Sequence, residues 1–300
     1  MSINNIAFAT KFATELDKIL VQKSQAAILE DKGMAAKFVG AHEVKLPVIG
    51  FAGLGDYDKK TGFAKGSVSV TQQVFTLTQD RARSFSIDRE DMDETGIANL
   101  AGNVMAEFVR TKVAPEVDAY TFSTIATKAT AANQTVALGD GKTLGSNVFG
   151  LITEAIGKVN DATGFTGEDI ILYVNPEVYA ALMATNEIHR HLRIDEFKRG
   201  EISTKVQKID NATIIPVSGN RMKTAYDFGN DGFEVAGGAE NIGIIAMPKN
   251  AAMLVKKTEK IRTFSPDVNQ QADAYKFDYR LYYDVLVKDS MKGSIYTYTY

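Results

Sequence analysis

Apolar residues near the start of the chain recur at the spacing of a helix. Residues 7–30 are therefore expected to form an amphipathic helix. The apolar positions are Phe8, Phe12, Leu16, Ile19 and Leu20. Such a helix either packs on its own domain or forms an arm that packs on a neighbouring copy of the chain, and the pattern leaves both interpretations open.

A glycine-rich stretch at residues 44–66 predicts a loop or hairpin tip around Asp56, Lys59 and Lys60. The following stretch, Val68 to Ile87, has the composition of one long strand and contains neither Gly nor Pro. Its apolar parity switches at Val74–Phe75, which indicates a bulge or a change of neighbour. At full length such a strand would reach about 66 Å. A compact domain of 300 residues is only about 50 Å across, so we expect this strand to leave the globule and lie on another copy.

The rest of the chain predicts a mixture of helices and strands. Asp93, Glu94 and Thr95 supply acidic and capping groups at the start of a long helical pattern, which Pro115 should kink or divide. Asn175 and Pro176 follow a short apolar strand and are typical of a helix N-cap and first helical position. Residues 275–287 place aromatic and aliphatic side chains on alternate positions, as in a strand with one buried face.

Composition narrows the possible functions. A net charge of −3 gives no broad basic surface for coating nucleic acid. The absence of cysteine excludes disulfides, thiolate catalysis and cysteine-based zinc sites. No secretory signal is visible, and no apolar run approaches the length needed to span a bilayer.

Short motifs give little reason to expect catalysis. The sequence "GDGKT" at 139–143 lacks the first glycine of a phosphate-binding loop, and a calcium-type loop starting at Asp91 lacks its final Glu. His189 and His191 have no evident third metal ligand. Aromatic residues interleaved with Lys276 and Arg280 could stack single-stranded nucleic acid, but a packed sheet face is the favoured interpretation. We expect no enzyme activity, and no catalytic, cofactor or metal site.

Four segments, in this order, resemble the major capsid proteins of tailed bacteriophages, which have the Hong Kong 97 fold. They are "FTLTQDRARSFSIDREDMDET", "APEVDAYTFS", "ILYVNPEVYAAL" and "IIPVSGNRM". The resemblance covers nearly the whole chain. It implies an α+β fold with an N-terminal arm at 1–43 and an extended β-hairpin, the E-loop, at 44–90. It also implies a peripheral domain at 91–167 and 251–300, with a spine helix at about 93–128, and an axial α/β domain at 168–250.

The resemblance implies a structural shell protein that self-assembles as hexamers and pentamers into the icosahedral head of a tailed phage. The shell would enclose double-stranded DNA, which it contacts non-specifically on its inner face. Assembly would occur in the bacterial cytoplasm without a membrane. A portal and a separate scaffolding protein are expected, because the E-loop starts near residue 44 and leaves little room for a fused scaffold. No Lys–Asn crosslinks are expected.

The residues expected at inter-subunit contacts fall into three groups. They are the charged strand positions Arg81, Arg83, Asp88, Glu90 and Asp91, the loop positions Asp56, Lys59 and Lys60, and the arm positions Phe8, Phe12 and Leu16. Opposite charges suit pairing between subunits. Two alternatives stay open: an encapsulin-type nanocompartment with the same fold and a protein cargo, and a soluble α+β enzyme or ligand-binding protein.

Overall fold

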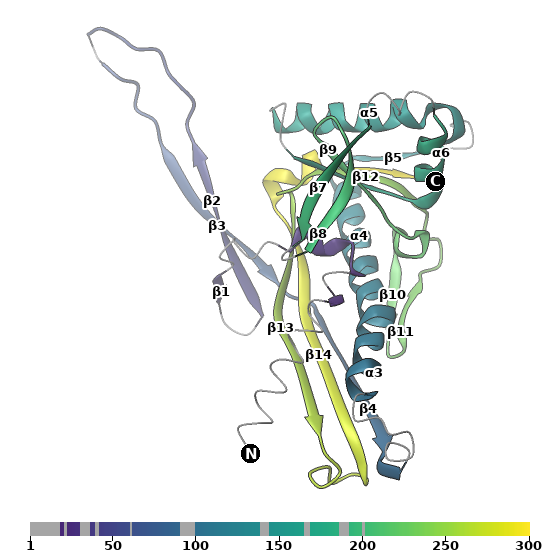
Figure 1. Ribbon diagram of the computed structural model, residues 1–300. Coiled ribbons are helices and arrows are strands. Elements are labelled where there is room, and N and C mark those ends of the chain that lie inside the picture. Colours follow the sequence, from purple (N-terminus) through teal and green to yellow (C-terminus); the bar gives the residue numbers. More distant parts are fainter. Residues whose placement is uncertain are drawn as a thin grey trace. The chain divides into compact units, whose positions relative to one another are not determined.

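The computed structural model describes residues 19–20, 23–30, 37–39, 42–60, 62–90, 100–138, 144–164, 169–185, 192–199 and 202–300. The chain divides into two compact units (Figure 1). The small unit is Lys32–Gln79, and the large unit combines Met1–Asp31 with Asp80–Tyr300.

The small unit is an antiparallel sheet in the order β1-β2-β3. Its strands are β1 (Lys37–Val39), β2 (Glu43–Phe51) and β3 (Val68–Thr76). The ladder between β2 and β3 is continuous, from the pair Glu43–Thr76 to the pair Phe51–Val68. Beyond Thr76, the Leu77 N–H donates to the His42 carbonyl at 2.8 Å and closes this end of the hairpin.

The expectation of a single strand from Val68 to Ile87 is wrong. The chain leaves the first ladder at Leu77–Thr78, and β4 (Gln79–Asp88) joins a different sheet, next to β14 (Ala274–Val287). The parity switch in the sequence does mark a change of neighbour, three residues earlier than the structure places it. The reach of about 66 Å expected from an unbroken strand therefore does not apply.

A mixed sheet of seven strands, in the order β5-β15-β12-β6-β9-β8-β7, forms the centre of the large unit. The pairs β6–β9 and β15–β5 are parallel and the other pairs are antiparallel. The strands are β5 (Thr135–Ala137), β15 (Tyr296–Thr299), β12 (Ile242–Pro248), β6 (Ile170–Val174), β9 (Ala212–Pro216), β8 (Ile202–Ile209) and β7 (Leu192–Arg199).

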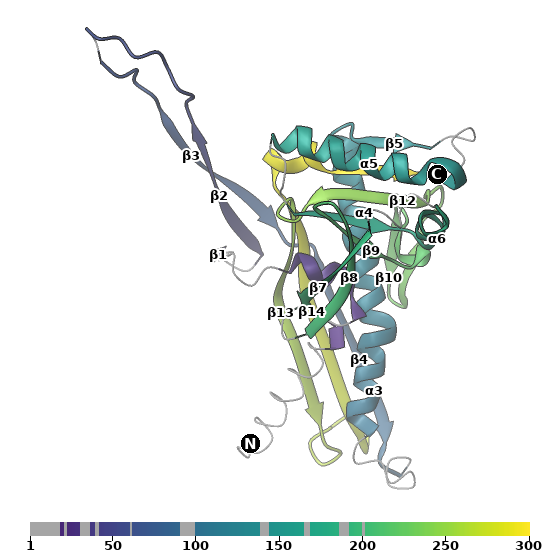
Figure 2. The ribbon, with the colours of Figure 1, turned by 45° about the horizontal axis from the view of Figure 1, so that its top comes forward.

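Helices cover both faces of this sheet, which explains why β6 is buried along its whole length. Ile170, Leu172 and Val174 point into a core shared with helices α5 (Leu144–Thr163) and α6 (Pro176–Ala184). Ile171 and Tyr173 point into the opposite core, which contains helix α4 (Ala114–Ala131). Figure 2 shows α5 lying along the sheet. A strand covered on both faces loses the alternating pattern and becomes uniformly apolar.

Local chemistry sets the start of α6 as the sequence predicts. The Asn175 side chain accepts a hydrogen bond from the Glu177 N–H at 2.9 Å, and Pro176 takes the first helical position. The prediction of a strand, an N-cap and a helix in this order is confirmed.

A second sheet, in the order β13-β14-β4, packs on a long helical segment. Its strand β13 spans Ala252–Phe264. The helical segment comprises α3 (Leu100–Phe108), a π-helical turn (Val109–Val113) and α4. Pro115 stands in the first turn of α4, where a missing N–H is tolerated, and the wide turn precedes it. Val113 and Ala114 keep right-handed helical backbone angles, so Pro115 does not divide the helix, and the winding changes from π-helical to α-helical just before it.

The face of β14 that carries Phe277, Tyr279, Leu281 and Tyr283 is buried against this helical segment. The alternation therefore reflects core packing and not a stacking platform. Five short elements complete the described fold. They are the 3₁₀ helices Ala26–Leu29, Gly219–Arg221 and Asp289–Ser294, and the hairpin of β10 (Tyr226–Gly229) with β11 (Gly232–Val235).

Candidate assembly surfaces

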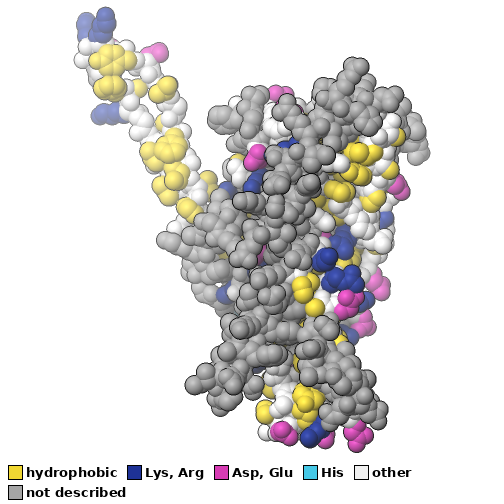
Figure 3. Space-filling view, in the orientation of Figure 1, with side chains coloured by type: hydrophobic (Ala, Val, Ile, Leu, Met, Phe, Trp, Pro, Cys, Tyr) yellow, Lys and Arg dark blue, Asp and Glu magenta, His cyan; other side chains and the backbone are white. Residues whose placement is uncertain are grey.

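One face of the β2–β3 hairpin is apolar and open to solvent. Directly paired residues share a face of an antiparallel ladder. The pairs Phe51–Val68 and Ile49–Val70 therefore lie together, with exposed fractions from 55% for Ile49 to 75% for Phe51. Figure 3 shows hydrophobic side chains along this hairpin. We call Ile49, Phe51, Val68 and Val70 the apolar face. Contiguous exposed apolar surface is uncommon on proteins that stay monomeric.

The opposite face of the same hairpin segment is more polar. Gly50 pairs with Ser69, and Val48 pairs with Thr71. A side chain at position 50 would place its Cβ only 2.7 Å from the Ser69 hydroxyl oxygen, so the Ser69 side chain would have to rotate to admit it. One face of this part of the hairpin is therefore apolar and the other is more polar.

The tip of the hairpin is a tight turn between Asp58 and Gly62. Their backbone groups exchange two hydrogen bonds, and Gly62 has a positive φ of 81°. Beside the turn, the Tyr57 and Phe63 rings meet edge to face at 5.2 Å, although both rings are exposed. Figure 3 shows Lys or Arg side chains gathered at this tip. The tip therefore combines an exposed aromatic pair with two aspartates and two lysines, and the predicted hairpin tip around Asp56, Lys59 and Lys60 is confirmed.

In the large unit, Arg81 of β4 binds both the long helix and the β10–β11 turn. Its Nε donates to Glu116 Oε1 at 2.6 Å. Its Nη2 donates to the carbonyls of Gly229 at 2.8 Å and Gly232 at 3.1 Å. The neighbouring Arg83 donates to the Asn230 carbonyl at 2.7 Å. Two arginines of β4 thus hold the turn of one hairpin through its backbone carbonyls.

These contacts change the interpretation of the two arginines. The sequence predicts partners in another chain, whereas the structure supplies partners within the same chain. Arg83 keeps about half of its side chain exposed, and its ion-pair partner Asp231 is almost fully exposed. An additional contact of either arginine with a neighbouring subunit stays a prediction.

A cleft of about 650 Å³ lies between β4, the long helix and the β10–β11 hairpin. Apolar side chains such as Phe85, Phe108 and Leu281 line it beside charged ones. Three of its arginines already pair with carboxylates: Arg81 with Glu116, Arg83 with Asp231, and Arg221 with Asp118. Among the described residues, no group of three His, Cys, Asp or Glu could hold a metal ion. The arginines of the cleft therefore link the elements that surround it.

The remaining residues expected at contacts have the following positions. Asp56, Lys59 and Lys60 are exposed near the hairpin tip, and Asp88 and Glu90 are exposed at the end of β4. The Glu90 N–H donates to the Asp88 carboxylate at 3.0 Å. Four residues lie outside the described part of the chain: Phe8, Phe12, Leu16 and Asp91. The loop at 139–143 and the histidines at 189 and 191 also lie outside it.

Sequence reasoning did not single out Asp118, a fully buried carboxylate in α4. Burial raises the pKa of this carboxyl group, and the hydrogen bonds from Ser24, Ala26 and Gln25 together with Arg221 oppose that rise. The signal was present in the sequence, because Asp118 is the charged residue on a helix face that also buries Val117 and Phe122. A single charge on a core-facing helix surface needs a specific partner.

The sequence matches no protein-family model and no curated protein. The fold nevertheless has clear counterparts among solved shell proteins. The capsid structure of the cyanophage P-SCSP1u aligns over 87% of this chain and 84% of that chain, with a TM-score of 0.59 at 14% identity. The asymmetric unit of the bacteriophage PhiM1 mature capsid aligns over 90% of this chain and 83% of that chain, with a TM-score of 0.56 at 11% identity.

A virus-like particle from Pyrococcus furiosus has the same fold. It aligns over 97% of this chain and 99% of that chain, with a TM-score of 0.56 at 11% identity. The mixed α+β architecture described above is therefore that of viral capsid proteins. Within the described residues, no helix combines the length and the apolar character needed to cross a membrane.

Proposed function

We propose that this chain is the major capsid protein of a tailed bacteriophage, which assembles as hexamers and pentamers into an icosahedral head around double-stranded DNA. The observation that carries the proposal is the likeness in fold to phage capsids over 87% and 90% of the chain. A role in a shell also gives a reason for the apolar face of the β2–β3 hairpin. A two-stranded ribbon is marginal in water, and a large exposed apolar surface needs a cover.

In this proposal the β2–β3 hairpin is the E-loop, and it lies on an adjacent subunit with its apolar face inward. The α3–α4 segment is the spine helix of a peripheral domain, and residues 168–250 form an axial domain around the symmetry axes. The N-terminal arm, at 1–43, contacts a neighbour. The mechanism is geometric, because many modest interfaces add up in a closed assembly.

The test is to express the full chain with candidate scaffolding protein and to examine purified material by electron microscopy. The expected result is closed icosahedral particles, and particles from infected cells should contain nuclease-protected double-stranded DNA. A chain that stays monomeric in sedimentation under all these conditions would contradict the proposal.

A second candidate is a nanocompartment shell that encloses a protein cargo. The likeness to the virus-like particle, which extends over 97% of this chain, favours this alternative. Particles that contain a co-purifying enzyme, and no nucleic-acid absorbance, would select it over the phage head.

A further inference from the structure

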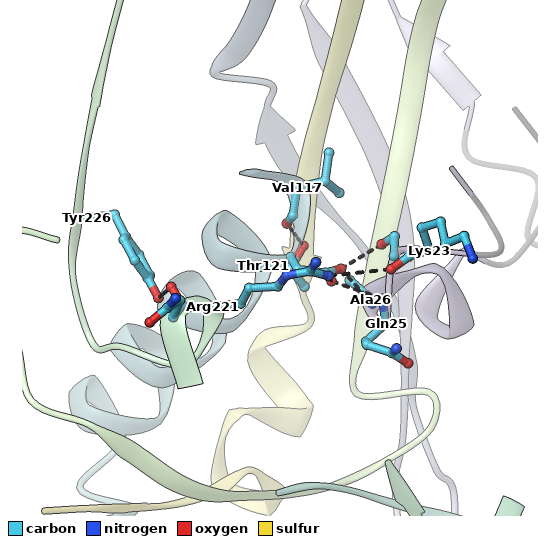
Figure 4. A network of polar contacts seen from close by, with 10 residues as sticks. Lys23, Gln25, Ala26, Val117, Thr121, Arg221 and Tyr226 are labelled. Atoms are coloured by element: carbon cyan, nitrogen blue, oxygen red, sulfur yellow. Dashed lines mark hydrogen bonds and ion pairs between the residues drawn. The ribbon is translucent and has the colours of Figure 1, made fainter. Parts of the chain in front are cut away.

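Asp118 connects three segments that are far apart in the sequence. Its Oδ1 accepts hydrogen bonds from Ser24 Oγ at 2.6 Å and from the Ala26 N–H at 2.9 Å. Its Oδ2 accepts from the Gln25 N–H at 3.0 Å and from Arg221 Nη1 at 2.9 Å. Figure 4 shows Arg221 reaching from its own 3₁₀ turn toward the backbone at Gln25 and Ala26, where dashed lines mark these contacts. Each carboxylate oxygen thus has two donors.

Two of these donors are the backbone groups at the start of the 3₁₀ helix Ala26–Leu29. The residue that precedes this helix, Gln25, makes no side-chain cap. Asp118 supplies the missing cap from a different helix, and a carboxylate suits the positive end of such a turn. Arg221 Nη1 also donates to the Lys23 carbonyl at 3.4 Å, so the backbone is held on both sides of Ser24.

The Asp118 network holds the segment Ser24–Ala26 in a fixed place, because the 3₁₀ helix that follows is also buried. Ala26, Ile28 and Leu29 are buried in the core that contains α4. A buried ion pair adds little net stability compared with apolar residues of the same volume. Its specific contribution is geometric, since three donors of the segment and the Arg221 guanidinium all converge on one carboxylate. Arg221 is the charged group that faces Asp118 from the packed elements.

We propose that Asp118 is a positioning residue for the N-terminal arm, and that with Arg221 it fixes the path of the chain at Ser24–Ala26 against α4, between the buried Leu20 and the buried 3₁₀ helix Ala26–Leu29. This inference rests on the proposed function, because a fixed base matters for an arm that must reach a neighbouring subunit. Asp118, Arg221 and the Ser24–Ala26 backbone together form what we call the arm clasp.

The experiment compares the wild-type chain with D118N by hydrogen exchange on unassembled subunits, followed by assembly and electron microscopy. The Asn variant keeps the volume but loses the charge and one acceptor oxygen. The expected result is at least tenfold faster exchange at the Gln25 and Ala26 amides, with unchanged exchange in β6. Trypsin should cleave after Lys23 faster, and particles should be fewer or irregular.

Two outcomes would overturn the proposal: unchanged exchange at Gln25 and Ala26, or faster exchange there with particles identical to wild type in yield and shape. Equal acceleration in β6 would show a general loss of stability and would also count against it. If D118N does not fold, S24A replaces it, because this variant removes one donor and leaves α4 intact. The expected changes are then smaller and in the same direction. Failure of the wild-type chain to form shells would contradict the proposed function, whereas the exchange measurement tests the clasp separately.

Discussion

The guanidinium of Arg81 donates through Nε to Oε1 of Glu116 at 2.6 Å, and this contact joins strand β4 to the first turn of helix α4. About a quarter of the Arg81 side chain is exposed, and Glu116 is more buried. The same guanidinium holds the carbonyls of Gly229 and Gly232. One side chain therefore fixes three elements relative to each other.

We expect a measurable coupling between Arg81 and Glu116. In a double-mutant cycle with R81A and E116A, the coupling free energy should be on the order of 1 kcal/mol, because the pair is partly screened by solvent. R81A alone should cost more than E116A, since it also leaves the carbonyls of the β10–β11 turn without their donor. Denaturant unfolding of the unassembled subunit measures both quantities. A coupling free energy near zero would show that the pair is incidental.

The two arginines of β4 should respond differently to charge reversal. R83E should leave the free energy of unfolding within about 0.5 kcal/mol of wild type, because Arg83 makes exposed contacts. R81E should destabilise the subunit, because it places a second carboxylate beside Glu116. If Arg83 also contacts a neighbouring subunit, R83E will reduce particle yield while R83K will not. Sedimentation after assembly separates these results, and normal assembly of R83E would remove Arg83 from the interface.

The apolar face of the hairpin should matter for assembly and not for the folding of the subunit. The double variant I49S/V70S removes side chains that are more than half exposed, so its unfolding free energy should change little. Full burial of one such side chain is worth about 1.5–3 kcal/mol, so the loss at every interface should sharply raise the concentration needed for assembly. The matched control is S69A/T71S on the opposite face. Equal effects of the two variants would contradict the assigned orientation.

Alkaline pH should destabilise the subunit through Tyr283. Burial, followed by the nearby Glu116 carboxylate, raises the pKa of its hydroxyl well above the ordinary value of 10.0. A folded pKa above the unfolded one means that this contribution to stability is complete below about pH 10 and is lost as the pH rises further. The Tyr283 hydroxyl has no hydrogen-bond partner among the described residues, so Y283F should be neutral or stabilising at pH 7.

Thermal unfolding of the wild-type chain and Y283F at pH 7 and pH 11 measures this effect. The difference between the two proteins isolates Tyr283 from the many lysines that also titrate in this range. Y283F should retain more of its stability than wild type at pH 11. A parallel loss of stability in both proteins would assign the alkaline effect to other groups.

The sequence predicted best where a few neighbouring residues determine the structure. Asn175 and Pro176 define a helix start by local hydrogen bonding and backbone restriction, and the β14 alternation follows from one buried face. The parity switch at Val74–Phe75 indicated a change of neighbour, but the exact position of the break at Leu77–Thr78 has no local signal, because neither residue type interrupts a strand. It occurs because β2 and β14, distant in sequence, pair with the two halves.

The partners of the β4 arginines were unpredictable for a related reason. Arg81 and Arg83 bind backbone carbonyls of a turn that lies almost 150 residues later in the chain. Every residue type has a backbone carbonyl, so the sequence does not indicate which carbonyl an arginine binds. Asp118 differs, because an acid on an apolar helix face is a visible exception that demands a buried partner. That partner, Arg221, could be identified only from the fold.

The π-helical turn at Val109–Val113 has a consequence for the rotational phase of the long helix. In an unbroken α-helix, which turns about 100° per residue, Phe108 and Tyr120 would point about 120° apart. Here both rings meet β14: Phe108 contacts Tyr279, and Tyr120 contacts Tyr283. The wider turn rotates the chain less per residue and brings the two halves of the helix into phase. One additional residue thus lets a single strand serve as the packing partner for both halves of the helix.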